Sequence, residues 1–378
     1  MDKTMGFSKI KKFIKKEIVF FVSCICAIIS CFFVPIDAEY LGYFNVKTLI
    51  CLFCKLVVVC GLQRTGVFKV YSKKLIRQFK NLRTLIIGLV YLTFLCGVVL
   101  SNEMALIVLL PLSLTILREI GKEDMVAFVF VLQNICANLG GMTTPIGNSS
   151  SIYLFSYFHI GVGEFFKIMS IPVLTALVIV FIVCNVFIPK EELKFEDKVK
   201  PSVDMQRLYA YLILFVIIIF MMFGLINLYA GFLLIAIGMW LLDKNLYKKI
   251  DYMLLLTFCM IFIFSGNLTR IDYVKEMATK LIVGRELFAG ILSTQVICNV
   301  PTAILFSRFT TDYAPLLLAV NIGSFGTMLA SLASLVAFKI YSKNFKKGKF
   351  HYLKVLTLAN FSILAVLVCV SYVVLKFV

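Results

Sequence analysis

Long apolar runs separated by short polar segments dominate this chain. Seven runs are largely uninterrupted, and most of them approach the length of about 20 residues at which a helix spans a bilayer. We interpret them as plain membrane crossings, at residues 18–35, 47–63, 167–189, 208–226, 230–242, 251–268 and 354–376. Lipid would then be the solvent for most of the protein surface.

Two further apolar stretches are interrupted near their middle by Gly, Thr, Asn and Pro. The stretch 125–158 is broken at 140–148, and the stretch 313–341 is broken at 321–327. At membrane depth, non-helical backbone is tolerated only where it faces protein or a water-filled cavity. We therefore predict two broken helices whose breaks face the interior of the protein.

Two more stretches consist of apolar arms that meet at a polar tip. In the stretch 83–118 the tip is Ser-Asn-Glu at 101–103, and in the stretch 286–307 it is Cys-Asn-Val-Pro-Thr at 298–302. Each arm is short, and Arg residues at both ends of the first stretch place those ends on the same side of the membrane. We predict two re-entrant hairpins.

The composition supports a membrane protein with a defined orientation. Of the 378 residues, 61% are hydrophobic and 15% are charged, whereas soluble domains have about 25% charged residues. The net charge of +18 lies in short loops, so we expect the lipid bilayer as partner and no nucleic acid. Most Lys and Arg residues fall on one side if the N-terminus is cytoplasmic, in a layout of nine crossings with the C-terminus outside. We expect a multi-pass protein of the cell (plasma or inner) membrane.

The two halves of the chain carry similar short motifs in the same order. Asn102 at the first hairpin tip corresponds to Asn299 at the second, and Asn138 in the first broken helix corresponds to Asn321 in the second. In the layout above, matching segments run in opposite directions. Inverted repeats are typical of alternating-access transporters, whose sites lie at the repeat interface near the bilayer midplane.

The repeat defines the predicted organisation. An amphipathic segment, typical of an interfacial helix, precedes each hairpin, at 68–82 and 271–282. We divide the chain into an N-terminal helix and loop (1–46), a first inverted repeat (47–189), a cytoplasmic linker (190–207), connecting helices (208–250) and a second inverted repeat (251–378). The predicted fold class is an all-α polytopic membrane protein, an inverted-repeat transporter with two re-entrant hairpins and two broken helices.

Polar groups at the hairpin tips and helix breaks form the predicted site. A broken helix presents free backbone N–H groups on one half and free carbonyls on the other, so an anion and a cation can bind side by side. Nearby amides and hydroxyls can cap the half-helices or bind substrate oxygens. We predict substrate-binding roles for Asn102, Thr144, Asn148, Ser149, Asn299, Thr302, Thr327 and Ser331. We predict coupling-ion roles for Ser101, Asn102, Glu103, Asn138, Gly141, Asn299, Asn321 and Gly326.

Glu103 is the main candidate for coupling. A carboxylate at membrane depth is costly and usually faces the interior with a partner or a proton. Lys55, on a neighbouring crossing, is either its counter-ion or a side chain that extends to the cytoplasmic face. The alternative for Glu103 is an ordinary solvated side chain at a wet tip.

These motifs resemble the ion transporter superfamily, which includes arsenite permeases, sodium/proton antiporters of the same fold, citrate transporters and divalent anion/sodium symporters. The resemblance covers residues 47–342, and its most specific part is the glycine-rich segment that ends in Thr-Pro-Ile-Gly-Asn at 144–148. Glu103 replaces the Asp usual in arsenite permeases, and Cys298-Asn299-Val300 replaces the Ser-Asn-Thr tip of the symporters, so the substrate stays open. The resemblance implies elevator-like motion of the hairpins and broken helices, and a homodimer.

We expect a secondary transporter that moves a small anion, a carboxylate or an inorganic oxyanion, with Na⁺ or H⁺ as the coupling ion. The alternative is a sodium/proton or arsenite-type efflux antiporter of the same fold. We do not expect an enzyme, because two isolated His residues and scattered Cys provide neither an activated nucleophile nor a metal cluster. The sequence has no Walker A motif for ATP-driven pumping, and it indicates no cofactor.

Overall fold

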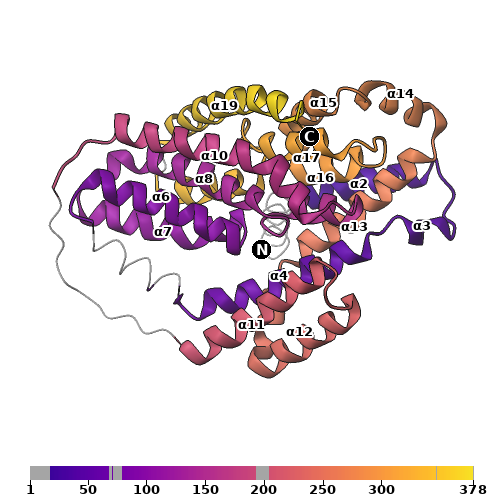
Figure 1. Cartoon of the computed structure of the whole chain (residues 1–378), viewed down its shortest axis with the longest axis horizontal. Helices are drawn as coiled ribbons and strands as arrows, with labels where there is room; N and C mark the ends of the chain where they lie inside the picture. Colours follow the sequence, from indigo (N-terminus) through magenta and orange to yellow (C-terminus); the bar gives the residue numbers. More distant parts are fainter. Residues whose placement is uncertain (1–17, 68–69, 71–78, 193–203, 346, 378) are drawn as a thin grey trace, which may run out of the picture.

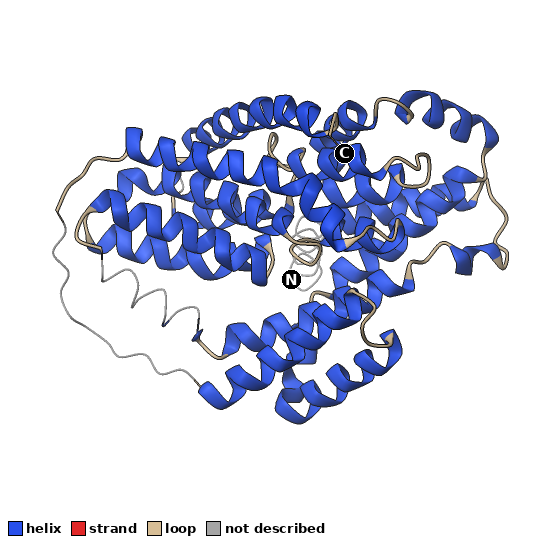
Figure 2. Cartoon of the chain, in the orientation of Figure 1, coloured by secondary structure: helices blue, strands red, loops and turns tan. Residues whose placement is uncertain are grey.

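Helices are the regular secondary structure of the described part of the chain, together with one isolated β-bridge between Asn81 and Glu192. The structure is a computed structural model, and it describes residues 18–67, 70, 79–192, 204–345 and 347–377. These residues form helices and no strand (Figure 2). Eight of the helices have the length and apolarity to cross a membrane. The prediction of an all-α polytopic membrane protein is therefore confirmed.

The helices follow one another with short connections. In chain order they are α2 (Ile18–Cys31), α3 (Glu39–Gly42), α4 (Val46–Arg64), α6 (Leu82–Val99), α7 (Asn102–Glu119), η1 (Glu123–Met125), α8 (Val126–Thr143), α9 (Ser149–Tyr157), α10 (Val162–Phe187), α11 (Met205–Met222), α12 (Leu228–Asp243), η2 (Lys244–Lys249), α13 (Tyr252–Thr269), α14 (Asp272–Ile282), α15 (Glu286–Ile297), α16 (Asn299–Phe306), α17 (Tyr313–Ile322), α18 (Leu332–Asn344) and α19 (Lys349–Val374).

Six of the seven predicted plain crossings coincide with helices long enough to span a membrane, and the first is shorter than predicted. The helix α2 ends at Cys31, four residues before Pro35. Proline cannot donate a helical hydrogen bond and disfavours helical backbone in the residue before it. Of the two predicted amphipathic segments, the second is helix α14. The first, at 68–82, lies largely outside the described residues, as does most of the linker 190–207.

Each predicted hairpin contains two helices that meet at its polar tip. The helices α6 and α7 have 18 residues each, about 27 Å at 1.5 Å per residue. The prediction of short arms is therefore wrong for the first hairpin, because its apolar residues continue from 82 to 119 with a single turn at 100–101. In the second hairpin, α15 has 12 residues and α16 has 8, so the arms are short there.

Both helix breaks exist, and the first begins later than the sequence suggests. The helix α8 continues through Gly140 and Gly141 and ends at Thr143. Gly140 serves close helix packing instead, because a Cβ atom there would lie 2.3 Å from the carbonyl oxygen of Phe94 on α6. The second break separates α17 from α18 and spans 323–331.

Several groups of helices lie next to one another in the molecule (Figure 1). The helices α6, α7, α8 and α10 lie side by side, with α19 packed along α8 and α10. The helices α11 and α12 pack on α4 at one edge. The helices α15, α16 and α17 lie between these groups and the pair formed by α2 and α13. The two breaks and the two hairpin tips therefore come from groups that contact one another.

Candidate functional site

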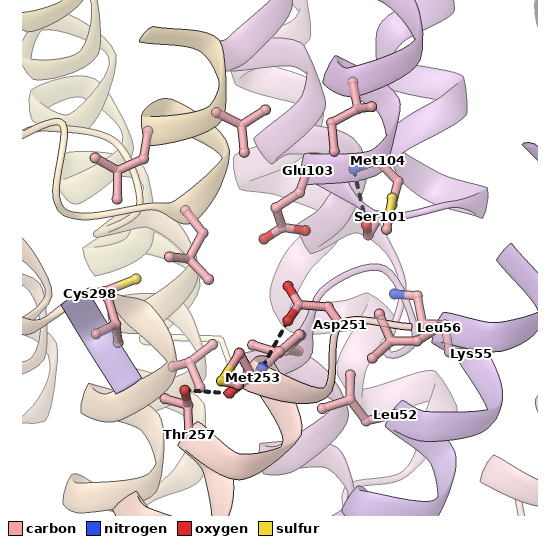
Figure 3. Close-up of a pocket in the computed structure, with 18 of the residues that line it drawn as sticks. Leu52, Lys55, Leu56, Ser101, Glu103, Met104, Asp251, Met253, Thr257 and Cys298 are labelled. Atoms are coloured by element: carbon pink, nitrogen blue, oxygen red, sulfur yellow. Dashed lines mark hydrogen bonds between the residues drawn. The ribbon is translucent and has the colours of Figure 1, made fainter. Parts of the chain in front are cut away.

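Both hairpin tips border one cavity of about 420 Å³, which we call the central cavity (Figure 3). The first residues of the helices that follow the two breaks, Ser149 of α9 and Leu332 of α18, line it as well. Its wall is mostly apolar, with side chains of α2, α4, α7, α13 and α18. The polar and tip residues that line it are Lys55, Ser101, Glu103, Ser149, Asp251, Thr257, Cys298, Pro301 and Lys339. Asp251 and Lys339 are exposed, so they mark the open end of the cavity.

Four helix N-termini border the central cavity. They are the starts of α7 at Asn102, α9 at Ser149, α16 at Asn299 and α18 at Leu332. Each start leaves backbone N–H groups without a helical partner and carries a partial positive charge. Three of the starts are capped by side chains, since Ser101, Asn148 and Ser331 each accept a hydrogen bond from a backbone N–H group. This arrangement favours a negatively charged ligand.

Two carboxylates and two ammonium groups line the same cavity. Glu103 is half-buried at the start of α7, and Asp251 precedes α13, where its carboxylate accepts a hydrogen bond from Leu254 N at 3.1 Å. Figure 3 shows both carboxylates pointing into the cavity, toward one another. Lys55 and Lys339 supply the positive charges. The cavity can therefore hold charges of either sign, depending on the protons and ions that it binds.

Lys55 is buried and bonded to the first helix break. Its ammonium group donates to the carbonyl oxygens of Ile146 and Gly147, with 2.9 Å to the latter. The alternative that Lys55 extends to the cytoplasmic face is therefore wrong. Lys55 and Glu103 share the cavity, but the hydrogen bonds of Lys55 go to backbone carbonyls.

Two buried hydrogen-bond clusters join the halves of the chain behind the cavity. In one, Asn138 Oδ1 accepts from Asn102 Nδ2 and from Ser331 Oγ, both at 2.9 Å. In the other, Asn321 Oδ1 accepts from Asn148 Nδ2 at 2.8 Å and from Ser151 Oγ at 3.2 Å. Both clusters connect a residue of the first break or hairpin with a residue of the second broken helix.

Gly141 lies between the two clusters. A Cβ atom there would lie 3.3 Å from Asn102 Cβ and 3.4 Å from Asn148 Cβ. Three polar atoms nearby are buried and have no hydrogen-bond partner among the described residues, namely Asn102 Oδ1, Asn138 Nδ2 and Thr144 Oγ1. Such atoms are rare in folded proteins and usually bind water or a ligand.

The other predicted residues have local partners. Asn299 Oδ1 accepts a hydrogen bond from Cys298 Sγ at 3.2 Å, and Thr302 Oγ1 donates to the carbonyl oxygen of Cys298 at 2.8 Å. Gly326 and Thr327 do not line the central cavity. Of the predicted residues, Ser101, Glu103 and Ser149 line the cavity. The two clusters contain Asn102, Asn138, Asn148, Asn321 and Ser331, with Gly141 between them. Asn299 and Thr302 bond to Cys298 at the second tip, and Thr327 bonds to Gln295 in the second break.

Three polar features of the site are not predicted by the sequence pattern. Asp251 was placed at the end of a crossing, although its position at the cavity mouth could not be read from the local pattern. Gln295 fills the second break, where Thr327 N donates to its Oε1 atom at 2.8 Å. Asn134 donates to Ser334 Oγ at 3.0 Å across the two halves. Single amides inside apolar helices were the available signal for the last two.

The opposite end of the molecule is closed by an ion-pair cluster. Arg270 donates to both carboxylate oxygens of Asp37, at 2.9 and 2.6 Å, and to Tyr43 OH at 3.2 Å. The hydrogen bond from Arg270 lowers the pKa of the Asp37 carboxyl. Arg308 donates to the carbonyl oxygen of Tyr43, with its guanidinium 5.5 Å from the ring centre of Tyr157. Within the described residues, no group of three His, Cys, Asp or Glu side chains is placed to bind a metal.

Comparison with known proteins shows the family. A family model described as a citrate transporter matches residues 9–337, most of the chain. The chain belongs to the citrate transporter family. An uncharacterized transporter of Methanocaldococcus jannaschii is 30% identical over 309 residues, which cover 80% of this chain and 83% of that protein. The inner membrane protein YbiR of Escherichia coli is 27% identical over 334 residues, 85% of this chain and 87% of that protein.

Membership in the citrate transporter family agrees with the helical architecture. The resemblance to the ion transporter superfamily, predicted from the hairpin tips and the 144–148 motif, is confirmed at the level of this family. Together with the eight helices of membrane-spanning length, it identifies the chain as a multi-pass membrane transporter.

The Asn138 cluster predicts a stability effect. Asn138→Ala removes the oxygen that accepts hydrogen bonds from Asn102 and Ser331. Two buried donors are then left unpaired, which lowers the free energy of unfolding by about 1–3 kcal/mol. We expect a lower melting temperature in detergent. Asn185→Ala is the matched control, because Asn185 donates to Phe181 O of its own helix, α10. Equal melting temperatures of the two variants would contradict a joining role for the cluster.

Proposed function

We propose that this member of the citrate transporter family is a secondary transporter that carries a small anion, a carboxylate or an inorganic oxyanion, by alternating access. The observation that carries the proposal is the convergence of four helix N-termini on the central cavity. Helix N-termini bind anions through free N–H groups and the helix dipole. A cavity of about 420 Å³ lies within the range of small-molecule sites, about 300–1,000 Å³.

The ion pairs support the predicted arrangement in the membrane. Every ion pair found among the described residues joins segments predicted on the same side. Arg64 pairs with Asp243 at one end of the molecule, and Arg270 pairs with Asp37 at the other. Asp251 at the cavity mouth lies close in sequence to Lys248 and Lys249, on the side with most Lys and Arg. By the positive-inside rule, the cavity opens to the cytoplasm.

The order of the helices supports an inverted repeat. The succession α4, α6, α7, α8, α9, α10 matches α13, α15, α16, α17, α18, α19, and the last members α10 and α19 both have 26 residues. The hairpin helices of the second half are shorter than those of the first. The start of α4 and the end of α13 lie together, because Arg270 donates to Tyr43, so these two helices run in opposite directions. The alignment of Asn138 with Asn321 also aligns Asn148 with Ser331. The bond between Asn138 and Ser331 is then the counterpart of the bond between Asn321 and Asn148.

Glu103 supplies a means of coupling. A carboxylate in an anion site repels the anion unless it holds a proton or a cation, since like charges in a region of low dielectric destabilise one another. Anion binding and uptake of H⁺ or Na⁺ at Glu103 would then favour each other. A gradient of H⁺ or of Na⁺ across the membrane would then drive the transport of the anion.

The pair of carboxylates supports a second candidate, a sodium/proton or arsenite-type efflux antiporter of the same fold. Glu103 and Asp251 both point into the central cavity (Figure 3). In such an antiporter, Glu103 would bind the transported cation directly. The four helix N-termini favour the anion transporter.

We further propose that the protein lies in the inner membrane and forms a homodimer. The name of the relative YbiR supports an inner-membrane location. A homodimer is what the superfamily resemblance implies, and we propose no other protein partner and no cofactor beyond the coupling ion.

A counterflow assay in proteoliposomes tests the proposed function. Labelled dicarboxylate, sulfate and arsenite are offered to vesicles preloaded with the same unlabelled compound. We expect accumulation of the dicarboxylate or of sulfate, whereas accumulation of arsenite alone would support the arsenite-type efflux antiporter. Exchange of Na⁺ for H⁺ with no exchange of any anion would contradict the proposal and support the antiporter.

Glu103→Gln separates coupling from exchange. The amide cannot take up a proton at neutral pH, so we expect gradient-driven uptake to fall more than tenfold while counterflow of the anion persists. Glu276→Gln is the control, because Glu276 is exposed on α14 and pairs with Lys280 at 2.6 Å. Unchanged gradient-driven uptake by Glu103→Gln would remove Glu103 from the mechanism.

A further inference from the structure

The carbonyls of the first helix break already have a cationic partner within the protein. Lys55 on α4 donates to the oxygens of Ile146 and Gly147, and its side chain is only 4% exposed. Charged side chains are almost never so buried unless they are paired. The oxygens belong to the unwound backbone between α8 and α9, directly before the N-cap residue Asn148. In transporters, unwound carbonyls of this kind coordinate Na⁺.

We propose that Lys55 is a built-in cation that occupies the position a coupling Na⁺ would take at the first break. This inference rests on the proposed function and deepens it, because it makes the first break independent of Na⁺. An ammonium group offers three N–H donors and one positive charge, which suit backbone carbonyl oxygens. Unlike a bound Na⁺, it cannot leave the site.

The second break is also filled by the protein, with a neutral group. Gln295 Nε2 donates to the carbonyl oxygens of Gly323 at 2.8 Å and Phe325 at 3.4 Å. Gly326 has a φ of 138°, and a Cβ atom there would lie 2.1 Å from Gln295 Oε1. The amide therefore fits closely against the turn. The oxygens bound by Lys55 and Gln295 are not free for an ion at either break.

The charges around Lys55 support a cation at this place. Glu103 on α7, Asp251 before α13 and Lys339 on α18 line the same cavity. With Lys55, the lining carries two acidic and two basic groups. Removal of the Lys55 charge would leave the carbonyls of Ile146 and Gly147 without their cation, next to a cavity whose lining then has more carboxylates than ammonium groups. Oxygen ligands of this kind suit a hard cation such as Na⁺.

Thermal melting in detergent, in NaCl or in choline chloride of equal concentration, tests the proposal. We expect the melting temperature of Glu103→Gln, which lacks the other proposed Na⁺ site but retains Lys55, to be the same in both salts. We expect Lys55→Met to melt lower in choline chloride and to recover by several degrees with Na⁺ in a saturable manner, since a ligand bound only by the folded state stabilises it. Lys55→Gln serves as a second variant. Lys47→Met is the matched control, because Lys47 lies on the same helix but does not line the cavity.

A specific Na⁺-dependent rise in the melting temperature of Glu103→Gln would overturn the proposal, because this variant retains Lys55 and lacks the Glu103 carboxylate. The proposal would also be overturned if Lys55→Met and Lys55→Gln fold and Na⁺ raises their melting temperatures no more than it raises that of Lys47→Met. If neither Lys55 variant folds, the comparison of Glu103→Gln in the two salts decides alone. The melting experiment needs no substrate, so a failure of the counterflow assay would refute the proposed function and leave this result standing.

Discussion

Backbone groups at membrane depth need partners inside the protein, and this constraint governs the whole arrangement. Lipid offers no hydrogen bonds, so each helix break must be satisfied by other parts of the chain. Lys55 and Gln295 donate to carbonyls of the two breaks, and Asn148 and Ser331 cap the half-helices that follow. The breaks are therefore rigidly held polar surfaces within an apolar bundle.

The same constraint ties the two halves of the chain together. The hydrogen bonds from Asn148 to Asn321 and from Ser331 to Asn138 run between segments nearly two hundred positions apart. Close packing of α6 on α8 at Gly97 and Gly140 positions the first hairpin tip beside this junction. The central cavity is lined by both tips and by the starts of α9 and α18, so its shape depends on both halves.

The helices and their interruptions were predictable because each depends on local composition. Apolar runs revealed most crossings, and Gly-Asn-Thr segments revealed both breaks. Three-dimensional packing decided the rest. Gly140 is helical because its missing side chain lets α6 approach, and the sequence pattern could not distinguish that role from a break. The partners of Lys55 and the place of Asp251 depend on contacts between segments distant in the chain, which single-sequence periodicity does not encode.

The central claim is that both hairpin tips face one cavity. The direct measurement is the sidedness of labelling by a membrane-impermeant maleimide, with the native Cys298 or a Ser101→Cys substitution as the single cysteine of an otherwise cysteine-free protein in oriented vesicles. The account predicts that both positions react from the cytoplasmic side and that the same transported anion slows both reactions. Reaction of one position only from the outside and of the other only from the inside would contradict it.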